Sequence, residues 1–277
     1  VLEERGFGVQ ALHDAGATHA GILDAAAELV RGARAGDVIV FQYAGHGTRV
    51  PDYDGDESDQ MDEAYVPIDY GDGAFLVDDD LRAVFAELRE GVNLTCFVDC
   101  CHSATITRIL ARRADARSRG RARFLTPAAA ALAAHERFRA SLAGRPGGEQ
   151  ARDRSSAVRW VTFSACQATE EALEYDGQGD FTRHALAILG AGDADAFTHG
   201  AFQRRLVDAF GPDRRQTPHL DCPHGWEELP LLAALHRMSG PALDAARGGN
   251  GTRNGHPAGR VRQIAEDLLD VAAQLHG

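Results

Sequence analysis

The sequence contains no lysine, and every one of its 29 Lys+Arg positions is arginine. Together with the many alanines and glycines, this bias indicates a GC-rich bacterial genome. The chain also lacks any run of 18 or more apolar residues, the length that a helix needs to cross a bilayer. We therefore expect no association with a membrane.

Cysteines are few and follow no regular framework. The five positions, an odd number without any C-x-x-C pair, are Cys96, Cys100, Cys101, Cys166 and Cys222. This pattern argues against a structural zinc site and against a scaffold of disulfides. It is typical of a protein in a reducing compartment, and we expect the cytoplasm.

Basic residues are fewer than acidic ones. The 277 residues include 29 Lys+Arg and 41 Asp+Glu, which give a net charge of −12. Such a balance argues against a nucleic-acid surface and is compatible with attraction of basic substrates. The charge is uneven, because residues 52–80 are rich in Asp and residues 108–159 in Arg. A hydrophobic content of 44% allows a sizeable core in one large domain or two small ones.

Two short apolar runs, 38–43 and 92–98, are rich in β-branched and aromatic residues and are bounded by turn residues. They are typical of buried strands in a parallel sheet. His46 follows the first run, and Cys101 follows the second. Because ligands of open α/β sheets bind outside the carboxyl ends of the strands, we expect both side chains at one ligand-binding edge.

A thiol and an imidazole at one edge are sufficient for thiolate catalysis. The backbone N–H groups of Gly47 and Cys101 are candidates for an oxyanion hole. Either residue alone is as readily explained by a structural role, since free cysteine is often buried. The pair at matching strand ends favours catalysis. Adjacent side chains of an extended chain point to opposite sides, so only one of Cys100 and Cys101 faces His46.

The sequence resembles a known family at these positions. Segments 43–47 (YAGHG) and 99–103 (DCCHS) resemble the His and Cys motifs of the metacaspases and the bacterial caspase-like proteases (orthocaspases), and the acidic segments 54–57 and 62–64 resemble the loop between them. The resemblance resumes over 161–189. It implies an α/β fold, namely a caspase-like three-layer sandwich with a mostly parallel central sheet flanked by helices. It also implies cysteine endopeptidase activity.

The resemblance assigns roles to single residues. It aligns Cys101 with the nucleophile and His46 with its partner, and it places Asp99 at the base of the pocket for the residue before the scissile bond. A carboxylate there favours Arg, then Lys, in the substrate. Ala44 stands where the family has a pocket serine, which makes the pocket more open or less polar. Cys166, also at a strand end, is expected to form a pocket wall, since no His motif accompanies it.

Calcium is the one cofactor that the resemblance raises, because many metacaspases need it. Asp62, Asp78 and Asp79 are the candidate ligands. The remaining ligand position is Arg108, and a cation there opposes calcium binding. We therefore expect activity without calcium and without any other cofactor.

The resemblance also suggests an organisation in four segments: a large-subunit-like catalytic segment over 1–110, an Arg-rich connector over 111–157, a small-subunit-like segment over 158–235, and a flexible stretch with a C-terminal helix over 236–277. Within the last, residues 261–275 have the apolar spacing of an amphipathic helix. The family's first strand is missing from 1–110. We therefore expect an upstream segment or other domains as partners.

Other expectations concern local structure and alternatives. Helices are predicted over 77–89, 127–142, 181–189 and 202–210, and an acidic loop over 50–80. The Arg-rich connector has two interpretations, a solvated link or an exposed site of autocleavage after Arg. The partners of a protease would be proteins with exposed Arg or Lys. The alternatives are a catalytically silent caspase-like binding or signalling module and a calcium-sensing module.

Overall fold

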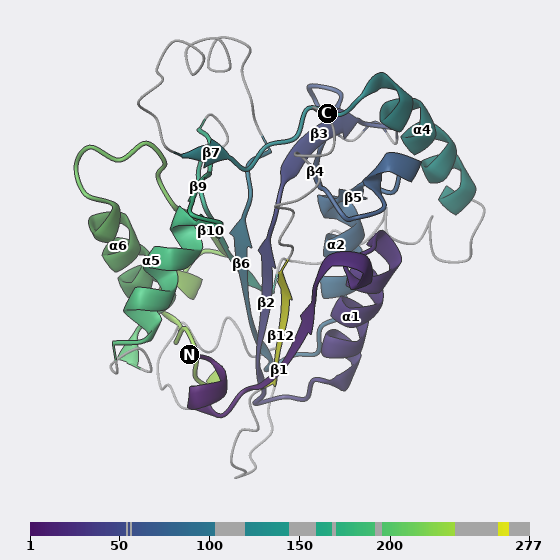
Figure 1. Ribbon diagram of the computed structural model, residues 1–277. Helices are drawn as coiled ribbons and strands as arrows, with labels where there is room; N and C mark the ends of the chain where they lie inside the picture. Colours follow the sequence, from purple (N-terminus) through teal and green to yellow (C-terminus); the bar gives the residue numbers. More distant parts are fainter. Residues whose placement is uncertain are drawn as a thin grey trace.

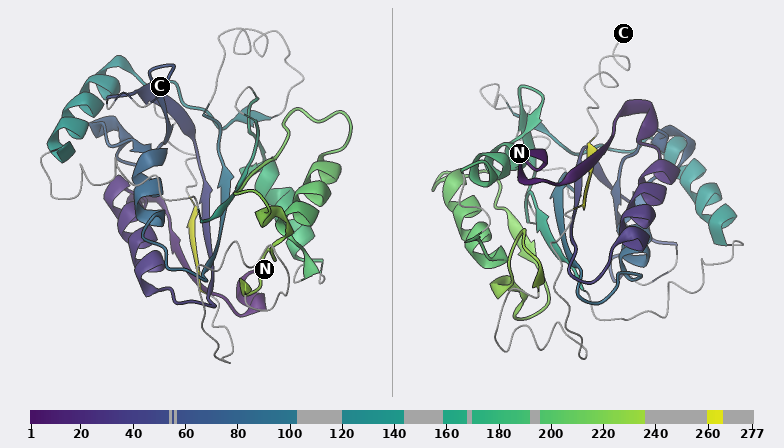
Figure 2. Two further views of the ribbon diagram at one scale, coloured as in Figure 1. Left: turned by 180° about the vertical axis from the view of Figure 1, so that it is seen from behind. Right: turned by 90° about the horizontal axis from the view of Figure 1, so that it is seen from below.

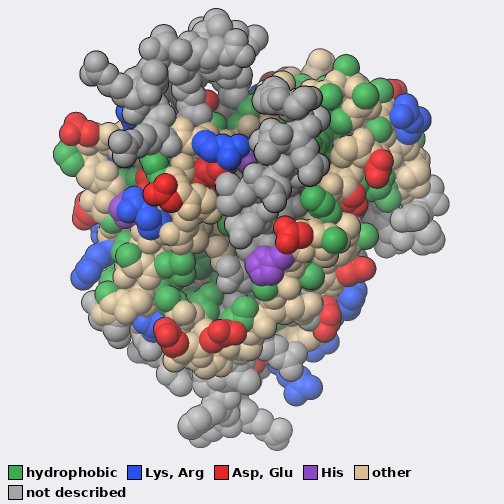
Figure 3. All heavy atoms as spheres, viewed as in Figure 1, with side chains coloured by type: hydrophobic (Ala, Val, Ile, Leu, Met, Phe, Trp, Pro, Cys, Tyr) green, Lys and Arg blue, Asp and Glu red, His purple; other side chains and the backbone are tan. Residues whose placement is uncertain are grey.

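We analysed a computed structural model of the chain. The structure describes residues 1–53, 55, 57–102, 120–143, 159–167, 170–191, 196–235 and 260–265. Basic side chains in the described part of the face drawn in Figure 3 are scattered among acidic and apolar ones. No helix in these ranges is both long and apolar enough to cross a bilayer.

A six-stranded sheet forms the centre of the molecule (Figure 1). Four of its five strand pairs are parallel, and only the last strand runs antiparallel to its neighbour. In spatial order the strands are β1 (Gly8–Leu12), β12 (Arg260–Ala265), β2 (Val38–Ala44), β6 (Asn93–Asp99), β8 (Val161–Ser164) and β11 (His219–Asp221). The runs predicted as buried strands thus lie side by side as β2 and β6, and every residue of β6 is buried.

Helices cover both faces of this sheet (Figures 1 and 2). On one face lie α1 (His19–Gly32) and α2 (Asp78–Phe85), and on the other α5 (Asp180–Leu189) and α6 (His199–Phe210). Each face has its own apolar core, because alternate residues of β2 and β6 point to opposite sides. The predicted caspase-like three-layer architecture, mostly parallel and flanked by helices, is confirmed.

Helix α1 begins where the sequence provides a cap. The Thr18 hydroxyl accepts a hydrogen bond from the Gly21 amide at 3.0 Å, which satisfies one of the free N–H groups of the first turn. Ile22, Ala26 and Leu29 recur at helical spacing and are buried against the sheet. Local sequence and tertiary packing therefore agree along this helix.

The prediction of an acidic loop over 50–80 is wrong for much of that segment. It contains parts of a small antiparallel sheet made of β3 (Gly47–Pro51), β4 (Met61–Tyr65) and β5 (Leu76–Val77). Acidic residues dominate the composition here, but the buried Val50, Ala64 and Phe75 form a separate apolar cluster that holds the sheet together. Short 3-10 helices occur at Glu3–Arg5, Asp14–Gly16, Tyr70–Asp72 and Trp226–Glu228.

Part of the predicted solvated connector is in fact packed into the molecule. Within it, β7 (Arg121–Ala122) joins β9 (Leu173–Tyr175) and β10 (Gln178–Gly179) in a third sheet, and α4 (Ala129–Ala143) follows. Arg123, next after β7, is only 5% exposed. A charge buried to this degree needs partners, and these are described with the site below.

The prediction of a C-terminal helix over 261–275 is wrong for residues 261–265. Residues 260–265 form strand β12, which pairs in parallel with β1 on one side and β2 on the other; residues 266–275 lie outside the described part. The physical reason is that β1 and β2 offer unpaired backbone groups to a strand inserted between them.

Candidate active site

The ends of β2 and β6 bring the two predicted catalytic residues together. Ala44 and Asp99, the last residues of these strands, are register partners, and the Gly45 amide donates to the Asp99 carbonyl at 3.2 Å. His46 and Cys101 each lie two residues beyond a strand end. Both therefore occupy the carboxyl edge of the sheet, where α/β proteins bind their ligands.

The neighbouring cysteines lie on opposite sides of the sheet. Cys101, fully buried, belongs to the apolar core that α5 and α6 cover. Cys100 belongs to the core on the α1 side, where its Sγ lies 3.2 Å from Nε2 of His102. Burial also raises the pKa of the Cys100 thiol well above its usual range, which disfavours a thiolate there.

Two backbone amides at this edge converge on one oxygen atom. The N–H groups of Gly47 and Cys101 both donate to the carbonyl oxygen of Arg123, at 2.9 and 3.1 Å. Position 47 has to be glycine for this approach, because a Cβ there would overlap the carbonyl of Cys101. Two donors aimed at one carbonyl oxygen are the arrangement that stabilises a developing oxyanion.

His46 sits in a partly buried and positively charged environment. Burial, followed by the charges of Arg123 and Arg121, lowers its pKa from 6.5 to about 4. The imidazole is consequently neutral at pH 7 and able to accept a proton. The Tyr43 hydroxyl donates to the His46 carbonyl at 2.7 Å, which holds the main chain of this residue in place.

The thiol of Cys101 lies next to a second thiol. Cys101 Sγ donates to the carbonyl of Glu170 at 3.2 Å, and Cys166 Sγ lies 3.6 Å from the same oxygen. A hydrogen bond with Cys101, then burial, raises the pKa of Cys166. Cys166 thus stays protonated and lies beside the candidate nucleophile.

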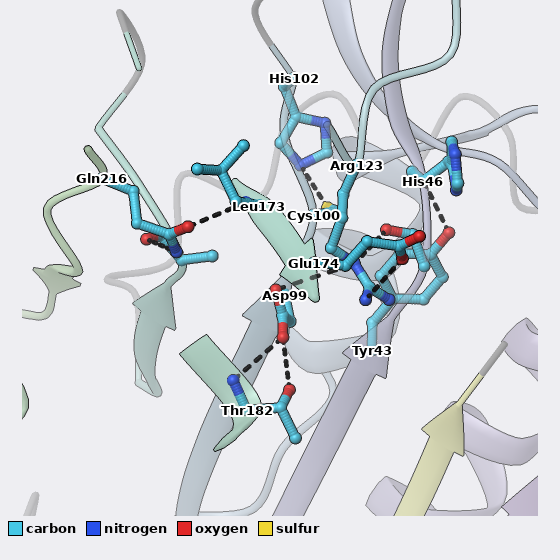
Figure 4. A network of polar contacts seen from close by, with 12 residues as sticks. Tyr43, His46, Asp99, Cys100, His102, Arg123, Leu173, Glu174, Thr182 and Gln216 are labelled. Atoms are coloured by element: carbon cyan, nitrogen blue, oxygen red, sulfur yellow. Dashed lines mark hydrogen bonds and ion pairs between the residues drawn. The ribbon is translucent and has the colours of Figure 1, made fainter. Parts of the chain in front are cut away.

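Asp99 is a buried carboxylate whose two oxygens have different surroundings. Its side chain is 1% exposed. Oδ2 accepts hydrogen bonds from the amide and the hydroxyl of Thr182 at 3.0 and 2.5 Å. Oδ1 has no hydrogen-bond partner among the described residues and lies 3.8 Å from Nε of Arg123 (Figure 4). A Cβ at Gly179 would overlap this carboxylate, so glycine is needed there too.

Glu174 is a site residue that the sequence reasoning missed. The residue is 8% exposed, and its carboxylate lies 3.3 Å from Nη1 of Arg123. Nε of the same arginine donates to the Gly45 carbonyl at 3.1 Å. Glu174, on β9, and Asp99, on β6, thus both lie within ion-pair distance of one guanidinium (Figure 4). No motif marks Glu174, and only the pairing of β9 with β7 reveals its place.

Two of the three calcium candidates lie at the start of a helix and are paired with an arginine. Asp78 and Asp79, in the first turn of α2, are ion-paired with Arg82 at 3.4 and 3.2 Å. Asp62 is buried on β4. No three His, Cys, Asp or Glu side chains of the described residues are grouped so as to hold a metal, and Arg108 lies outside those residues. Arg82 thus engages two of the three candidate carboxylates and would compete with a cation for them.

Comparisons with known proteins cover this part of the chain. The family profile described as "Metacaspase, peptidase C14 domain" matches residues 5–110. Metacaspase-1 of Kluyveromyces lactis is 43% identical over 90 residues, which are 32% of this chain and 21% of that protein. Metacaspase-1B of Aspergillus niger is 45% identical over 87 residues, 31% of this chain and 20% of that protein. The chain thus spans about a fifth of the length of these relatives.

A solved structure matches over a longer range. Protein GSU0716 from Geobacter sulfurreducens has a TM-score of 0.61, 25% sequence identity, and coverage of 84% of each chain. The family profile match includes both strand ends and the residues that follow them, from Tyr43 to Cys101. Over residues 5–110 the chain is therefore similar to the metacaspase, peptidase C14 domain and to the fungal metacaspases.

Proposed function

We propose that the chain is a cysteine endopeptidase that cleaves proteins after Arg, and less well after Lys, with Cys101 as nucleophile and His46 as its base. One observation carries the specificity: the buried carboxylates of Asp99 and Glu174 enclose a guanidinium. Arginine gains more than lysine from such a pocket, because its planar fork donates to two acceptors at once. Exposed Arg or Lys in partner proteins would then define the substrates.

In the first step His46 takes the Sγ proton of Cys101. The lowered pKa of His46, about 4, supports a neutral imidazole that acts as general base. In the structure the thiol donates a hydrogen bond to the Glu170 carbonyl, so it must first rotate away from this carbonyl and toward the imidazole. The thiolate then attacks the carbonyl carbon of the substrate residue held in the pocket.

The second step concerns the oxygen of that carbonyl. As negative charge develops, the amides of Gly47 and Cys101 donate to it, as they do to the Arg123 carbonyl at rest. His46 then returns the proton to the amine of the leaving chain, and water releases the acyl group from Cys101. The imidazole, the thiol and both amides in this proposed mechanism belong to residues that directly follow β2 and β6.

Hydrolysis of fluorogenic peptides that end in Arg, Lys or Asp tests this proposal. We expect turnover of the Arg peptide, slower turnover of the Lys peptide and none of the Asp peptide. The matched variants are Cys101→Ala, which should abolish turnover, and Cys100→Ala, which should retain it because Cys100 lies on the other face of the sheet. Turnover of the Asp peptide alone, or of the Arg peptide by Cys101→Ala, would contradict the proposal.

A further inference from the structure

We propose that Cys101 and Cys166 form a reversible disulfide when the chain meets a peroxide, with Cys166 as the thiol that resolves an oxidised nucleophile. The inference rests on the proposed function for its consequence, which is that oxidation stops the peptidase and a dithiol restores it. Two thiols share one hydrogen-bond acceptor at the carboxyl edge of the sheet, and the proposed peptide hydrolysis uses only one of them.

The two sulfur atoms converge on the carbonyl oxygen of Glu170. Sγ of Cys101 lies 3.2 Å from this oxygen, and Sγ of Cys166 lies 3.6 Å from it. A hydrogen bond also links the two thiols to each other. A disulfide bond is about 2.0 Å long, so its formation from this arrangement requires only small movements of the two side chains.

The backbone brings the two cysteines to a separation that a disulfide can span. β6 and β8 are paired in parallel, with Val98 opposite Ser164, and the Ala165 amide donates to the Val98 carbonyl at 2.9 Å. Cys101 and Cys166 follow this register pair closely on the two segments. Neighbouring strands lie about 4.8 Å apart, and disulfides join Cα atoms separated by about 4.4–6.8 Å. The spacing of the two strand ends therefore suits a crosslink.

The shared acceptor is held in place by hydrogen bonds of its own residue. The carboxylate of Glu170 accepts hydrogen bonds from the amide and the hydroxyl of Thr217, at 2.5 and 2.9 Å. The Glu170 amide donates to the Gln167 carbonyl at 2.8 Å. Because the acceptor is anchored in this way, it keeps the thiols of Cys101 and Cys166 next to each other.

The other cysteines are not placed to take this role. All five cysteines belong to the described residues, and all are free thiols. Cys96 and Cys100 belong to the apolar core on the opposite face of the sheet. Cys222 follows β11, which β8 separates from β6, and its Sγ lies 4.0 Å from a carboxylate oxygen of Glu227. Cys166 is therefore the thiol that can resolve an oxidised Cys101.

The two thiols differ in their reactivity toward a peroxide. A hydrogen bond with Cys101, then burial, raises the pKa of Cys166, so this thiol stays protonated. In the proposed mechanism His46 takes the Sγ proton of Cys101. Since the thiolate is the form that a peroxide oxidises, Cys101 reacts first.

The oxidation consumes one peroxide for two thiols. The Cys101 thiolate attacks one oxygen of hydrogen peroxide, the O–O bond breaks, and Cys101 becomes a sulfenic acid. The hydroxide that leaves takes the proton from His46 and becomes water. The Cys166 sulfur then attacks the sulfenic sulfur, the S–O bond breaks, and the hydroxyl leaves with the Cys166 proton as a second water. The two thiols have thus lost two electrons, which have reduced the peroxide to water.

The disulfide would both stop catalysis and preserve the nucleophile. With Sγ of Cys101 bonded to sulfur, no thiol is available to attack a peptide. Exchange with a dithiol, which is itself oxidised to a disulfide, returns both cysteines to thiols. Without a resolving thiol, a sulfenic acid is oxidised further to a sulfinic acid, which thiols do not reduce. A transient bond of this kind suits the reducing compartment that the cysteine pattern indicates.

Peptide mapping of the full chain under non-reducing conditions tests the crosslink. The reduced chain is treated with hydrogen peroxide, the remaining thiols are alkylated, and trypsin is added. Cleavage after arginine releases residues 90–108, which contain Cys101, and residues 160–183, which contain Cys166. We expect these two peptides to be joined with the loss of two hydrogens and to separate after treatment with dithiothreitol. Fragmentation of the joined peptide should place the bond at Cys101.

Matched variants identify the two partners. Cys101→Ala should give no joined peptide. Cys166→Ser should instead gain oxygen at Cys101 as a sulfinic acid, because no resolving thiol is present. Cys100→Ala and Cys222→Ala each remove a thiol that is not beside Cys101, and both should form the joined peptide as the wild type does. Circular dichroism checks that every variant is folded.

Hydrolysis of an Arg peptide measures the consequence, with each variant compared with its own rate before peroxide. The wild type should lose activity in step with formation of the joined peptide and should regain it with dithiothreitol. Cys222→Ala should behave in the same way. Cys166→Ser should lose activity and should not regain it, because the sulfinic acid resists thiols.

The mapping and the peptide assay together separate the possible outcomes. A wild-type chain that is oxidised to a sulfinic acid at Cys101 without the joined peptide overturns the inference, and so does a chain whose thiols stay unmodified. A bond from Cys101 to a cysteine other than Cys166, or full recovery of Cys166→Ser with dithiothreitol, overturns it too. A reduced chain that forms the joined peptide but hydrolyses no peptide supports the thiol pair and sinks the proposed function.

Discussion

Thr182 donates two hydrogen bonds, from its amide at 3.0 Å and its hydroxyl at 2.5 Å, to the same oxygen of Asp99. The contact joins the start of α5 to the end of β6, and it orients the carboxylate. The other oxygen of Asp99 is left to face Arg123. Under the proposed function this carboxylate selects a cationic side chain in the substrate, and we expect its removal to change that selectivity.

Asp99→Asn should lower kcat/KM for an Arg-ending peptide by about a hundredfold, since a buried charge pair loses one partner. Turnover of a peptide with a neutral residue at that position should change little. Glu174→Gln, whose carboxylate lies 3.3 Å from the arginine, should lower kcat/KM for Arg by about tenfold. Equal losses for the Arg and neutral peptides would show that Asp99 supports the fold instead of the specificity.

Gly47→Ala should abolish most activity, because its Cβ would overlap the Cys101 carbonyl and displace an oxyanion donor. Loss of one such donor lowers kcat by roughly a hundredfold or more. Gly71→Ala is the matched control, since a Cβ there meets nothing within 4 Å. Steady-state kinetics on an Arg peptide measures both, and normal kcat in Gly47→Ala would argue against this amide as a donor.

The pH profile of kcat should reflect His46. Its pKa is lowered from 6.5 to about 4 by burial, Arg123 and Arg121, so the neutral base persists down to that pH. The acid limb of kcat should then lie near 4 and not near 6.5. Arg121→Gln removes a repelling charge and should move the limb to higher pH. A wild-type limb at 6.5 would mean that the imidazole titrates as in water.

Stability should fall on acidification because of a second histidine, His199, which lies outside the site. Burial lowers its pKa from 6.5 to about 4, and its ring nitrogens lie 3.2 Å from the Thr95 hydroxyl and 3.1 Å from the Trp226 carbonyl. Between these pH values the unfolded chain binds a proton that the folded chain does not. Stability is therefore lost as pH falls, by up to about 3 kcal/mol.

Urea denaturation at several pH values measures this loss. His199→Gln cannot be protonated, so its free energy of unfolding should depend less steeply on pH than that of the wild type. The residual slope of the variant reports the other groups, His46 among them. Identical slopes in variant and wild type would exclude His199 as the source.

Calcium should leave the rate on Arg peptides unchanged. Asp78 and Asp79 are already paired with Arg82, and an arginine bound to both competes with the cation. A titration of the full chain with Ca²⁺, with a chelator as the starting point, measures the effect. An increase of about tenfold or more, equivalent to about 1.4 kcal/mol, would overturn the expectation. Arg82→Ala frees both carboxylates, so any calcium response should be larger in this variant.

Local patterns in the sequence were sufficient for the outline of the fold. The apolar runs that became β2 and β6 and the periodicity of α5 and α6 each depend on neighbours a few residues apart. The same patterns placed His46 and Cys101 beyond two strand ends, because a parallel pair brings its carboxyl ends to one edge. The positions of reactive residues that directly follow a strand can therefore be predicted from the sequence.

Contacts between distant segments could not be found in this way. Glu174 reaches Arg123 only because β9 pairs with β7, and no short pattern marks either residue. The segment 260–265 has apolar spacing that suits a helix as well as a strand. It forms a strand because its backbone pairs with β1 on one side and β2 on the other. Likewise the acidic composition of 50–80 led us to predict a loop, whereas this segment contains strands that are stabilised by a few buried apolar residues.

The sequence by itself determined the two central strands, β2 and β6, and the two candidate catalytic side chains beyond their ends, since these follow from local propensity and from the alternation of side chains along a strand. Only the tertiary structure decided which arginine lies between Asp99 and Glu174, and whose carbonyl the amides of Gly47 and Cys101 bind. The physical reason is that burial of a charge and convergence of two donors are set by chain segments that meet in space, at separations that no local pattern encodes.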